Sequence, residues 1–492
     1  MNFASIRKAG TLFAQKKDLV ITNLNIKEND MNKKVPLEDI PLNSFHKKLT
    51  FYSAGGPFLD GYVLSIIGVV MLQLSDSLQL TTLWQGLIAS SALIGVFLGG
   101  FLGGWFTDKY GRKVLYLIDL IAIVAFSVAQ FWVESALMLF IWRLLIGIAV
   151  GADYPIATSF LAEYLPKKNR GPRLAAMVMM WFAGAAASYI VGELILKYVG
   201  GPDAWRWALA STIIPGAIFL VARAGTPESP RWLLNKGRVQ EADAVIKKVY
   251  GQAYSIKDLS EQQVDEKNKV SVWSLFHSGY GKRMLFICIF WTCAIIPIYA
   301  IYSFAPQFVK ALKLTGSLAT WGSVAITVLF LIGCMLASML VGVMGRKKLL
   351  FHSFLWSGLA IFLLGINPTA SSSMVLILFG GFAILMGGAQ VLQYVYPNEL
   401  FPTEIRASAV GLGTSLSRIG ATVGTYLVPF SLTSLGISTT MVIASIICLV
   451  GAWSAWALAP DIESMDLNDA ARLDNASHIK SRSTRRTKVS FD

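Results

Sequence analysis

Three charged side chains stand inside apolar stretches of the sequence, where a charge needs a partner or water. Asp60 lies well inside one apolar run, and Arg143 and Asp153 lie within another. A carboxylate in hydrocarbon costs about 2.5–3.5 kcal/mol on insertion scales unless it is paired or neutralised. Protonation removes the charge, and a nearby guanidinium group influences when it occurs. We therefore predict that Asp60 carries a proton with Arg143 as its partner; a permanent ion pair between two helices is the alternative.

The helix that contains Arg143 is predicted to pack closely against a neighbour. Arg143, Gly147, Gly151 and Pro155 recur every four residues and therefore lie near one face. Small residues on such a face let another helix approach. Asp153 stands on the same helix, about 80° around its axis from Arg143. We predict that Asp153 is a second proton-relay group or part of a polar pathway wall; a carboxylate satisfied by Tyr154 or by a neighbouring helix is the alternative.

Polar and aromatic side chains in the second half of the chain suit a hydroxylated ligand. Gln390, Gln393 and Tyr394 share one helix face by their spacing. Amides can hydrogen-bond hydroxyl groups, and the rings of Trp291 and Tyr299 can stack on the apolar face of a sugar. An amide in an apolar span also needs a partner, so we predict that the glutamine pair binds substrate. For the aromatic residues, packing or anchoring at the membrane interface is the alternative.

Arg418 is the only basic residue deep inside its apolar run. Its planar guanidinium group has a geometry that suits a carboxylate or a phosphate. We predict a substrate contact here if the ligand is an anion. The alternative is that Arg418 binds backbone carbonyl groups or lines a gate.

The composition limits the class of protein that can position these residues. The chain has 492 residues, of which 54% are hydrophobic and only 15% are charged, and its mean hydropathy is +0.57. Many separate apolar runs of about 20 residues indicate an all-α membrane protein with several spans. The net charge of +14 comes from basic residues beside these runs, so topology explains it better than nucleic-acid binding does. The four cysteines lack metal or disulfide spacing, and no common catalytic or nucleotide-binding motif is present, so we expect no enzyme, cofactor or metal.

Twelve apolar runs are long enough to cross a membrane. We predict spans at 51–74, 83–107, 114–132, 137–161, 173–198, 205–224, 283–308, 318–343, 348–366, 373–397, 409–431 and 436–459. The predicted divisions are an N-terminal tail (1–50), a first six-helix bundle (51–224), a central segment with short helices (225–282), a second six-helix bundle (283–459) and a basic tail (460–492).

The charges of the connecting loops predict how the chain is oriented. The loops after spans 2, 4 and 8 are rich in Lys and Arg, whereas those after spans 1, 3, 9 and 11 carry almost none. Lys310 and Lys313, after span 7, are a local exception. Because basic loops stay on the cytoplasmic side, we predict that both termini and the central segment are cytoplasmic, in a multi-pass protein of the cell membrane.

Four motifs identify the family that the chain resembles. The loop from Gly103 to Lys113 is similar to the signature loop of the major facilitator superfamily, and a Gly-Arg-Lys turn recurs at Gly345. The stretch from Arg143 to Gly171, the segment from Pro227 to Leu233 and the segment from Pro397 to Arg406 resemble motifs of its sugar-porter-like, metabolite:proton symporter group. This resemblance implies two pseudo-symmetric bundles of six helices, a central site and alternating access. It also implies that cytoplasmic ion pairs gate the protein, formed by Asp108, Arg112, Glu163, Arg170, Arg346, Glu399 and Arg406.

The chain departs from the sugar-porter pattern at the position that matters most for proton coupling. Sugar porters carry an acid directly after the Gly-Tyr of span 1, and Val63 stands there in this chain. Asp60 precedes Gly61-Tyr62 instead, about one helical turn earlier and on a similar face. The pairing of Asp60 with Arg143 is carried over from the proton-coupled sugar porters by this resemblance.

Taken together, the sequence predicts a secondary active transporter that uses the proton gradient to move a small polar metabolite, with a sugar or polyol preferred. Its expected partners are the substrate, protons and the lipid bilayer, and we expect it to work as a monomer. An organic-anion:proton transporter is the alternative, based on Asp153 and Arg418. A nutrient sensor on the same fold that does not transport is a further alternative.

Overall fold

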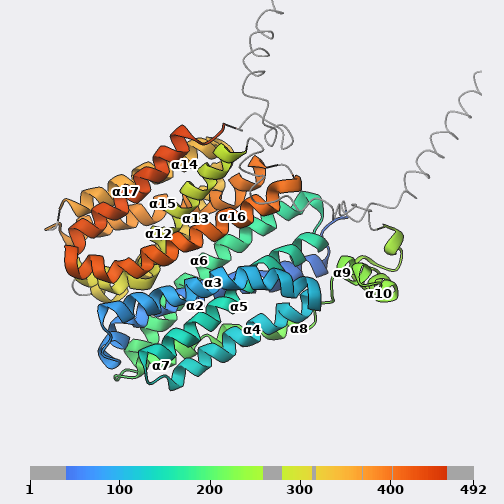
Figure 1. Ribbon diagram of the computed structural model, residues 1–492, viewed down its shortest axis with the longest axis horizontal. Helices are drawn as coiled ribbons and strands as arrows, with labels where there is room; N and C mark the ends of the chain where they lie inside the picture. The colour runs from blue at the N-terminus through green and yellow to red at the C-terminus, as the bar shows by residue number, and fades with distance from the viewer. Residues whose placement is uncertain (1–39, 259–279, 313–316, 368, 402, 462–492) are drawn as a thin grey trace, which may run out of the picture.

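The computed structural model describes residues 40–258, 280–312, 317–367, 369–401 and 403–461. Within these ranges the secondary structure is helical and no strand is present, which confirms the predicted all-α class. Figure 1 shows long helices that lie side by side, with two short helices at one end. The helices of the first half are α2 (Ser44–Ser77), α3 (Thr82–Tyr110), α4 (Arg112–Ala129), η1 (Gln130–Trp132), α5 (Ala136–Tyr164), α6 (Lys167–Tyr198), α7 (Ala204–Ala210) and α8 (Ile213–Ala224). Those that follow are α9 (Pro230–Asn235), α10 (Val239–Tyr250), η2 (Ile256–Asp258), α12 (Gly281–Ala311), α13 (Ser317–Met344), α14 (Arg346–Gly365), α15 (Ser372–Leu400), α16 (Thr403–Phe430), η3 (Ser431–Leu435) and α17 (Gly436–Ala457).

The described helices account for the predicted spans. Eleven stretches are long and apolar enough to cross a membrane in the part of the chain that the structure describes, and the last of them, Ala409–Ala457, runs through both α16 and α17. The first helix begins earlier than predicted, at Ser44 rather than at residue 51. Asn43 causes this, because its side chain accepts a hydrogen bond from the backbone N–H of His46, while Nδ1 of His46 accepts one from the N–H of Asn43. This reciprocal cap satisfies two amide groups at the helix start.

The sixth predicted span is two helices rather than one. The chain is continuous helix from Ala204 to Ala210 and again from Ile213 to Ala224, with a short break at Ser211 and Thr212. Pro215 explains the break, because its ring clashes with the carbonyl group four residues earlier and it has no N–H to donate. The predicted span at 205–224 still agrees with the membrane-crossing stretch Ala204–Ala224, which the break divides into two helices.

Helix α12 is broken near its C-terminal end. Phe304 has non-helical backbone angles (φ −137°, ψ 20°), two residues before Pro306. Pro306 cannot donate to the carbonyl of Tyr302, which would be its partner in a regular helix. The hydroxyl of Tyr189 on α6 donates to this carbonyl instead, at 2.9 Å.

The two short helices α9 and α10, which were predicted as part of the central segment, pack on the first bundle. Ala242, Ile246 and Val249 form the buried face of α10. Asn43 donates its side-chain N–H to the carbonyl of Val249 at 2.8 Å, so the start of α2 lies beside α10. We call this end of the molecule the α10 end, and the other the opposite end (Figure 1).

The helices form two groups that meet along a common interface. Within the first half α2 packs on α6 and α3 on α5, and within the second half α12 packs on α16 and α14 on α17. The halves are joined mainly by α2 with α12, α6 with α13 and α3 with α16, and also by α6 with α15. A site between the bundles is therefore lined by α2, α3, α6, α12, α13 and α16.

Candidate functional site

Asp60 lies midway along α2 and is buried, with 4% of its surface exposed. The charged groups that act on its carboxylate are Asp153 and Arg223 in the first half of the chain and Arg418 in the second half. Asp60 therefore lies where charges from both bundles meet. Asp60 is thus buried at the candidate site, and its role as a proton carrier stays a prediction.

Asp153 forms a buried ion pair with Arg223, a residue that the sequence analysis did not select. Its carboxylate lies 2.7 Å (Oδ1 to Nη1) and 3.4 Å (Oδ2 to Nη2) from the guanidinium group of Arg223 on α8, and both side chains are fully buried. Asp119 on α4 also approaches Arg223, with 3.7 Å between Oδ1 and Nη1. We call Asp119, Asp153 and Arg223 the acid cluster. It joins α4, α5 and α8.

The surroundings of Arg223 hold its guanidinium group in place. The group lies 3.8 Å from the ring centre of Tyr116, and Nη1 also donates to the backbone carbonyl of Tyr116 at 3.1 Å. Nε donates to the carbonyl of Tyr52 at 3.2 Å. The hydroxyl of Tyr116 is hydrogen-bonded to Ser53 at 2.9 Å. The N-terminal halves of α2 and α4 thus supply the partners that a buried arginine requires.

A glycine allows α2 to reach the acid cluster. A Cβ atom at Gly56 would lie 1.7 Å from Oδ2 of Asp153 and 2.5 Å from Nη2 of Arg223. Only a residue without a side chain fits this close approach. Gly56 and Asp60 are one helical turn apart on the same face of α2. The close approach at Gly56 therefore brings the turn that carries Asp60 toward the acid cluster.

The predicted ion pair between Asp60 and Arg143 is absent. Arg143 is 1% exposed, and its Nε and Nη1 atoms have no hydrogen-bond partner among the described residues. Arg143 stands ten residues before Asp153 on α5, which is about 15 Å along the helix. Because Asp60 lies one turn closer to the α10 end than the family position at Val63, it lies near Asp153 and Arg223 rather than near Arg143.

Asp119 and Arg223 could have been found from the sequence. Asp119 is an acid inside the predicted third span, so the criterion that selected Asp60 applies to it as well. Arg223 stands next to the last residue of the predicted sixth span, 205–224, and the sequence analysis did not select it. The position of Arg223 on α8, with its side chain directed into the bundle, required the structure.

Across the interface, Arg418 and Tyr299 bring a charge and an aromatic ring to the same place. Nη1 of Arg418 on α16 donates to the hydroxyl of Tyr299 on α12 at 2.5 Å. The Tyr299 ring meets Trp181 of α6 edge to face, with 5.7 Å between ring centres. Trp181 also contacts Tyr302 in this way, at 5.5 Å. Trp181, missed by the sequence analysis, therefore links the first bundle to the predicted substrate residues of the second.

The predicted glutamine pair forms, and its members bind each other. Gln390 donates to the carbonyl of Ala294 on α12 at 2.8 Å, and Gln393 donates to Oε1 of Gln390 at 3.0 Å. Trp291 is buried nearby on α12, where its ring packs against Gly413 of α16. The pair holds α15 against α12 in this conformation. The side chain of Tyr394 lies outside the described residues.

At the α10 end, one of the expected gating pairs is well formed. Arg346, at the start of α14, donates two hydrogen bonds to Glu399 near the end of α15, at 2.9 and 2.8 Å. Gly345 precedes Arg346 with a φ of 78°, a backbone conformation that favours glycine. The side chains of four predicted gating residues lie outside the described part of the molecule; these are Asp108, Glu163, Arg170 and Arg406.

The corresponding turn in the first half is held by a residue that the sequence analysis did not select. The carboxylate of Glu228 accepts hydrogen bonds from the backbone N–H groups of Arg112 and Lys113, at 3.1–3.2 Å. These N–H groups lie at the N-terminus of α4, where the positive end of the helix dipole also stabilises a carboxylate. Gly111, with a φ of 101°, leaves room for Glu228 and Trp232. The Pro-Glu-Ser-Pro-Arg-Trp segment thus caps α4, which its sequence motif alone did not indicate.

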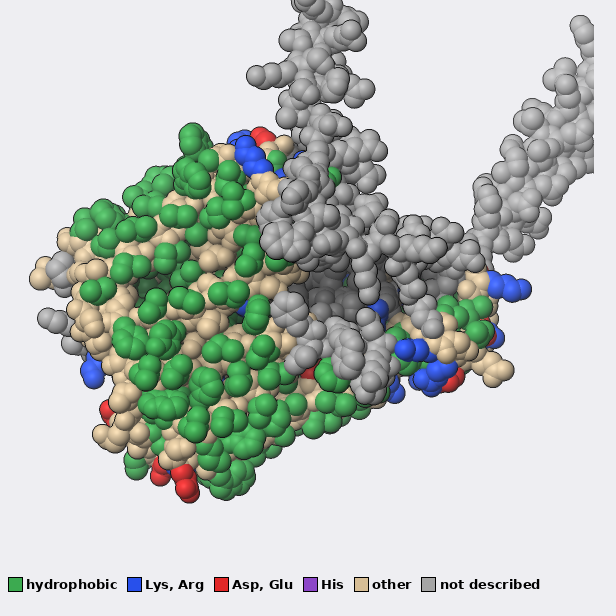
Figure 2. Space-filling model, in the orientation of Figure 1, with side chains coloured by type: hydrophobic (Ala, Val, Ile, Leu, Met, Phe, Trp, Pro, Cys, Tyr) green, Lys and Arg blue, Asp and Glu red, His purple; other side chains and the backbone are tan. Residues whose placement is uncertain are grey.

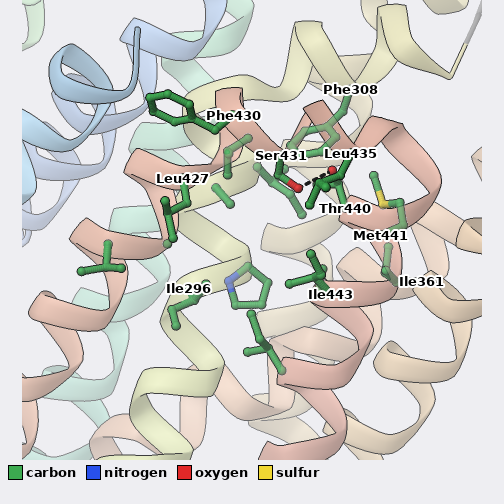
Figure 3. A pocket seen from close by; sticks show the side chains of 18 of the residues that line it. Ile296, Phe308, Ile361, Leu427, Phe430, Ser431, Leu435, Thr440, Met441 and Ile443 are labelled. Atoms are coloured by element: carbon green, nitrogen blue, oxygen red, sulfur yellow. Dashed lines mark hydrogen bonds between the residues drawn. The ribbon is translucent and has the colours of Figure 1, made fainter. Parts of the chain in front are cut away.

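A cavity of about 610 Å³ lies elsewhere in the second bundle (Figure 3). Its walls come mainly from α12, α16 and α17, and they are almost wholly apolar. Two of its hydroxyl groups, on Ser431 and Thr440, are hydrogen-bonded to each other at 2.7 Å. Val423 and Leu427 line the cavity and are exposed on the side of the bundle. None of the predicted site residues lines it, and its walls do not suit a polar substrate.

The outer surface agrees with a membrane environment. Hydrophobic side chains cover the flank of the helices in Figure 2, and the Lys, Arg, Asp and Glu side chains in this view gather toward the ends. Such a broad apolar surface is expected of helices in contact with lipid.

Comparisons with known proteins agree with this architecture. The model of the family described as Sugar (and other) transporter matches residues 47–472. The YaaU protein of Escherichia coli (strain K12) is 40% identical over 437 residues, which are 89% of this chain and 97% of the relative. The inner membrane metabolite transport protein YgcS of the same organism is 34% identical over 442 residues, 90% of this chain and 97% of the relative.

Solved structures of the xylose transporter XylE from E. coli share the fold. Its inward-open conformation has a TM-score of 0.73 at 20% identity and covers 86% of this chain and 99% of that chain. A second structure, described as the major facilitator superfamily proton:xylose symporter XylE bound to 6-bromo-6-deoxy-D-glucose, has a TM-score of 0.67 at 22% identity, covering 87% and 98%. The arrangement of the helices is therefore that of this superfamily.

Proposed function

The chain belongs to the Sugar (and other) transporter family of the major facilitator superfamily, and from this premise we propose that it couples the inward flow of protons to the transport of a small polar metabolite. It is a multi-pass membrane transporter and not an enzyme. Its mechanism on this proposal is alternating access, in which the two bundles rock about a site between them. The chain works as a monomer in the cell membrane.

The burial and the electrostatic surroundings of Asp60 support the coupling proposal: it is buried and is acted on by Asp153 and Arg223 of one bundle and by Arg418 of the other. Protonation of Asp60 removes a negative charge from the interface and so changes its attraction to Arg418. Charges act strongly on each other where water is excluded. A proton at Asp60 therefore favours one relative position of the bundles over the other, which is what coupling requires.

The contacts between the bundles support a conformation that is closed at the opposite end. A Cβ atom at Gly68 would lie 2.1 Å from the carbonyl oxygen of Tyr302, and one at Gly86 would lie 2.5 Å from that of Tyr426. Gly68 lies beyond Asp60 on α2, and Gly86 stands near the start of α3, so both contacts are far from the α10 end. We place the α10 end and both termini in the cytoplasm from the loop charges. The closed end is then extracellular.

Two gates follow from this orientation. Arg346 and Glu399 act as a cytoplasmic ion pair within the second bundle. We assign the same gating role to the other predicted gating residues, which are Asp108, Arg112, Glu163, Arg170 and Arg406. Ion pairs of this kind stabilise one state of the transporter and lose partners in the other.

A sugar or polyol is the preferred substrate. The relative described as a xylose transporter shares the fold, and Trp181 and Tyr299 offer aromatic faces at the bundle interface. Gln390 and Gln393 supply amides that can exchange their mutual hydrogen bond for one to a hydroxyl group. An organic anion is the second candidate, because Arg418 stands beside Tyr299 with a charge that suits a carboxylate.

Transport into vesicles tests the proposal. The purified protein is placed in proteoliposomes with an imposed pH gradient, and uptake of labelled sugars, polyols and carboxylates is measured with and without a protonophore. The proposal expects one sugar or polyol to accumulate against its gradient and the protonophore to abolish this. Accumulation of a carboxylate alone would replace the substrate class, and equilibration that ignores the pH gradient would overturn the coupling.

A further inference from the structure

The acid cluster contains more negative than positive charge. Asp119 and Asp153 both lie against Arg223, and all three side chains are buried. If both carboxylates were ionised, the cluster would keep one uncompensated negative charge away from water. Asp60, which acts electrostatically on Asp153, would add a second. An uncompensated buried charge is costly, and a bound proton removes it.

The geometry allows one proton to be held by two side chains. Oδ1 of Asp153 and Oδ1 of Asp119 lie 2.7 and 3.7 Å from the same Nη1 atom of Arg223, so the two carboxyl groups meet at one guanidinium nitrogen. Two carboxylates this close cannot both ionise without a large electrostatic cost. A single proton between them forms an O–H···O⁻ hydrogen bond, and the remaining charge of the pair is balanced by Arg223.

The groups that face this pair come from every helix around it. Asp60 approaches from α2, Tyr116 from α4 and Arg223 from α8. Arg418 of α16 acts on Asp60 from the second bundle. Tyr116 is an additional neutral group at the edge of the cluster, and its hydroxyl is hydrogen-bonded to Ser53. Arg223 is thus the only cation in direct contact with the two carboxyl groups among the described residues.

We propose that Asp119 and Asp153 share one proton beneath Arg223 and that this pair, with Asp60, forms the proton-binding site of the transporter. The inference rests on the proposed proton-coupled function and names residues that carry it. An ionised Asp60 repels the pair and favours its protonation, so the proton can pass between the pair and Asp60 as the bundles move. When the proton leaves, the cluster gains one negative charge, which the positive charge of Arg223 no longer balances.

Infrared spectroscopy of the purified protein tests proton occupancy without transport. A protonated carboxylic acid has a carbonyl band that shifts in heavy water, and this band should be present in the wild-type protein at neutral pH. It should be lost in Asp119→Asn, which leaves the 2.7 Å contact of Asp153 with Arg223 in place. Asp60→Asn should keep it. Asp243→Asn, on the exposed helix α10, is the matched control.

Transport of protons with substrate completes the test. Asp119→Asn should lose more of its proton-driven accumulation than of its substrate exchange across the membrane. If wild-type protein moves no protons with substrate, the proposed function fails and the shared proton is tested by the infrared band alone. If wild-type protein does move protons, and Asp119→Asn keeps both the band and the wild-type proton-to-substrate ratio, the shared-proton site is wrong. Asp153→Asn gives a second variant, in which Asp119 is the remaining partner of Arg223.

Discussion

The hydroxyl group of Tyr189 on α6 donates a hydrogen bond to the backbone carbonyl of Tyr302 on α12, at 2.9 Å, and so joins the two bundles directly. The bond exists because Pro306 leaves this carbonyl without its helical partner. Gly68 of α2 packs against the same carbonyl. Three helices therefore meet at one backbone group near the end that we propose to be extracellular.

Tyr189→Phe should weaken the closed state of this end. The variant leaves the buried carbonyl of Tyr302 unsatisfied, at a cost of about 1–3 kcal/mol. When the bundles separate, water can reach the carbonyl, so the cost applies mainly to the closed state. The equilibrium should shift toward opening by roughly 5- to 150-fold. Labelling of a cysteine introduced near Gly68 by a membrane-impermeant reagent measures the change.

Tyr62→Phe provides the matched control for this gate. Tyr62 is also a buried tyrosine, but its hydroxyl is bonded to Ser211 within the first bundle, at 2.7 Å. Its loss should lower stability without changing access from the opposite end. If the two variants are labelled to the same extent, the proposed gating role of Tyr189 is wrong.

Gly56→Ala should disrupt the acid cluster by steric contact alone. The added methyl group would overlap with Asp153 and Arg223, so α2 must move away or the ion pair must break. Breaking a buried ion pair costs about 3–5 kcal/mol. We expect a large loss of thermal stability and of transport. Gly342→Ala, where a Cβ atom meets nothing within 4 Å, should be neutral or slightly stabilising. A Gly56→Ala protein of wild-type stability would contradict the described packing.

The sequence was sufficient for the fold because span length and loop charge are local properties. Twelve apolar runs predicted the helices, and the details that they did not predict depend on single side chains: Asn43 extends α2, and Pro215 divides the sixth span into two helices. The break in α12 depends on Pro306, which a hydropathy pattern does not register.

The candidate site was predicted only in part because partners depend on helix rotation and register. Asp60 and Asp153 stood out as charges in apolar runs, yet the partner of Asp60 was taken to be Arg143. A shift of one helical turn on α2 moved the carboxylate to the level of Arg223. The glutamine pair was predicted correctly to share a face, but its bond to Ala294 follows from the packing of α15 on α12.

A variant in which Arg346 and Glu399 exchange their charges should recover the transport activity that either single charge reversal lowers. The pair has two short hydrogen bonds and is partly exposed. Neighbouring charges of this kind have coupling energies of about 0.5–3 kcal/mol. Arg346→Glu and Glu399→Arg should each reduce transport, and the double variant should recover it. A double variant no better than the product of the two single effects would mean that the pair does not act as a gate.

Asp60→Asn should separate proton coupling from substrate movement. The amide has nearly the size of the carboxylate but cannot release a proton, so accumulation driven by a pH gradient should be lost. Exchange of labelled for unlabelled substrate across the membrane should continue, because it needs no net proton transfer. Both processes are measured in the same proteoliposomes. Loss of both to the same extent would indicate a structural role for Asp60 instead.

Arg418→Gln should distinguish a neutral substrate from an anionic one. If the substrate is a sugar or polyol, its affinity should change little, since one N–H group of Arg418 already donates to the hydroxyl of Tyr299. If it is a carboxylate, loss of a charged hydrogen bond should weaken binding by about 1.5–3 kcal/mol, or roughly 10- to 150-fold. Thermal stabilisation by each ligand measures this, because a ligand at 100 times its Kd stabilises the protein by about 2.7 kcal/mol. Arg238→Gln, whose exposed side chain pairs with Glu241 on α10, controls for the loss of a positive charge. A selective loss of carboxylate binding in Arg418→Gln alone would decide for the organic anion.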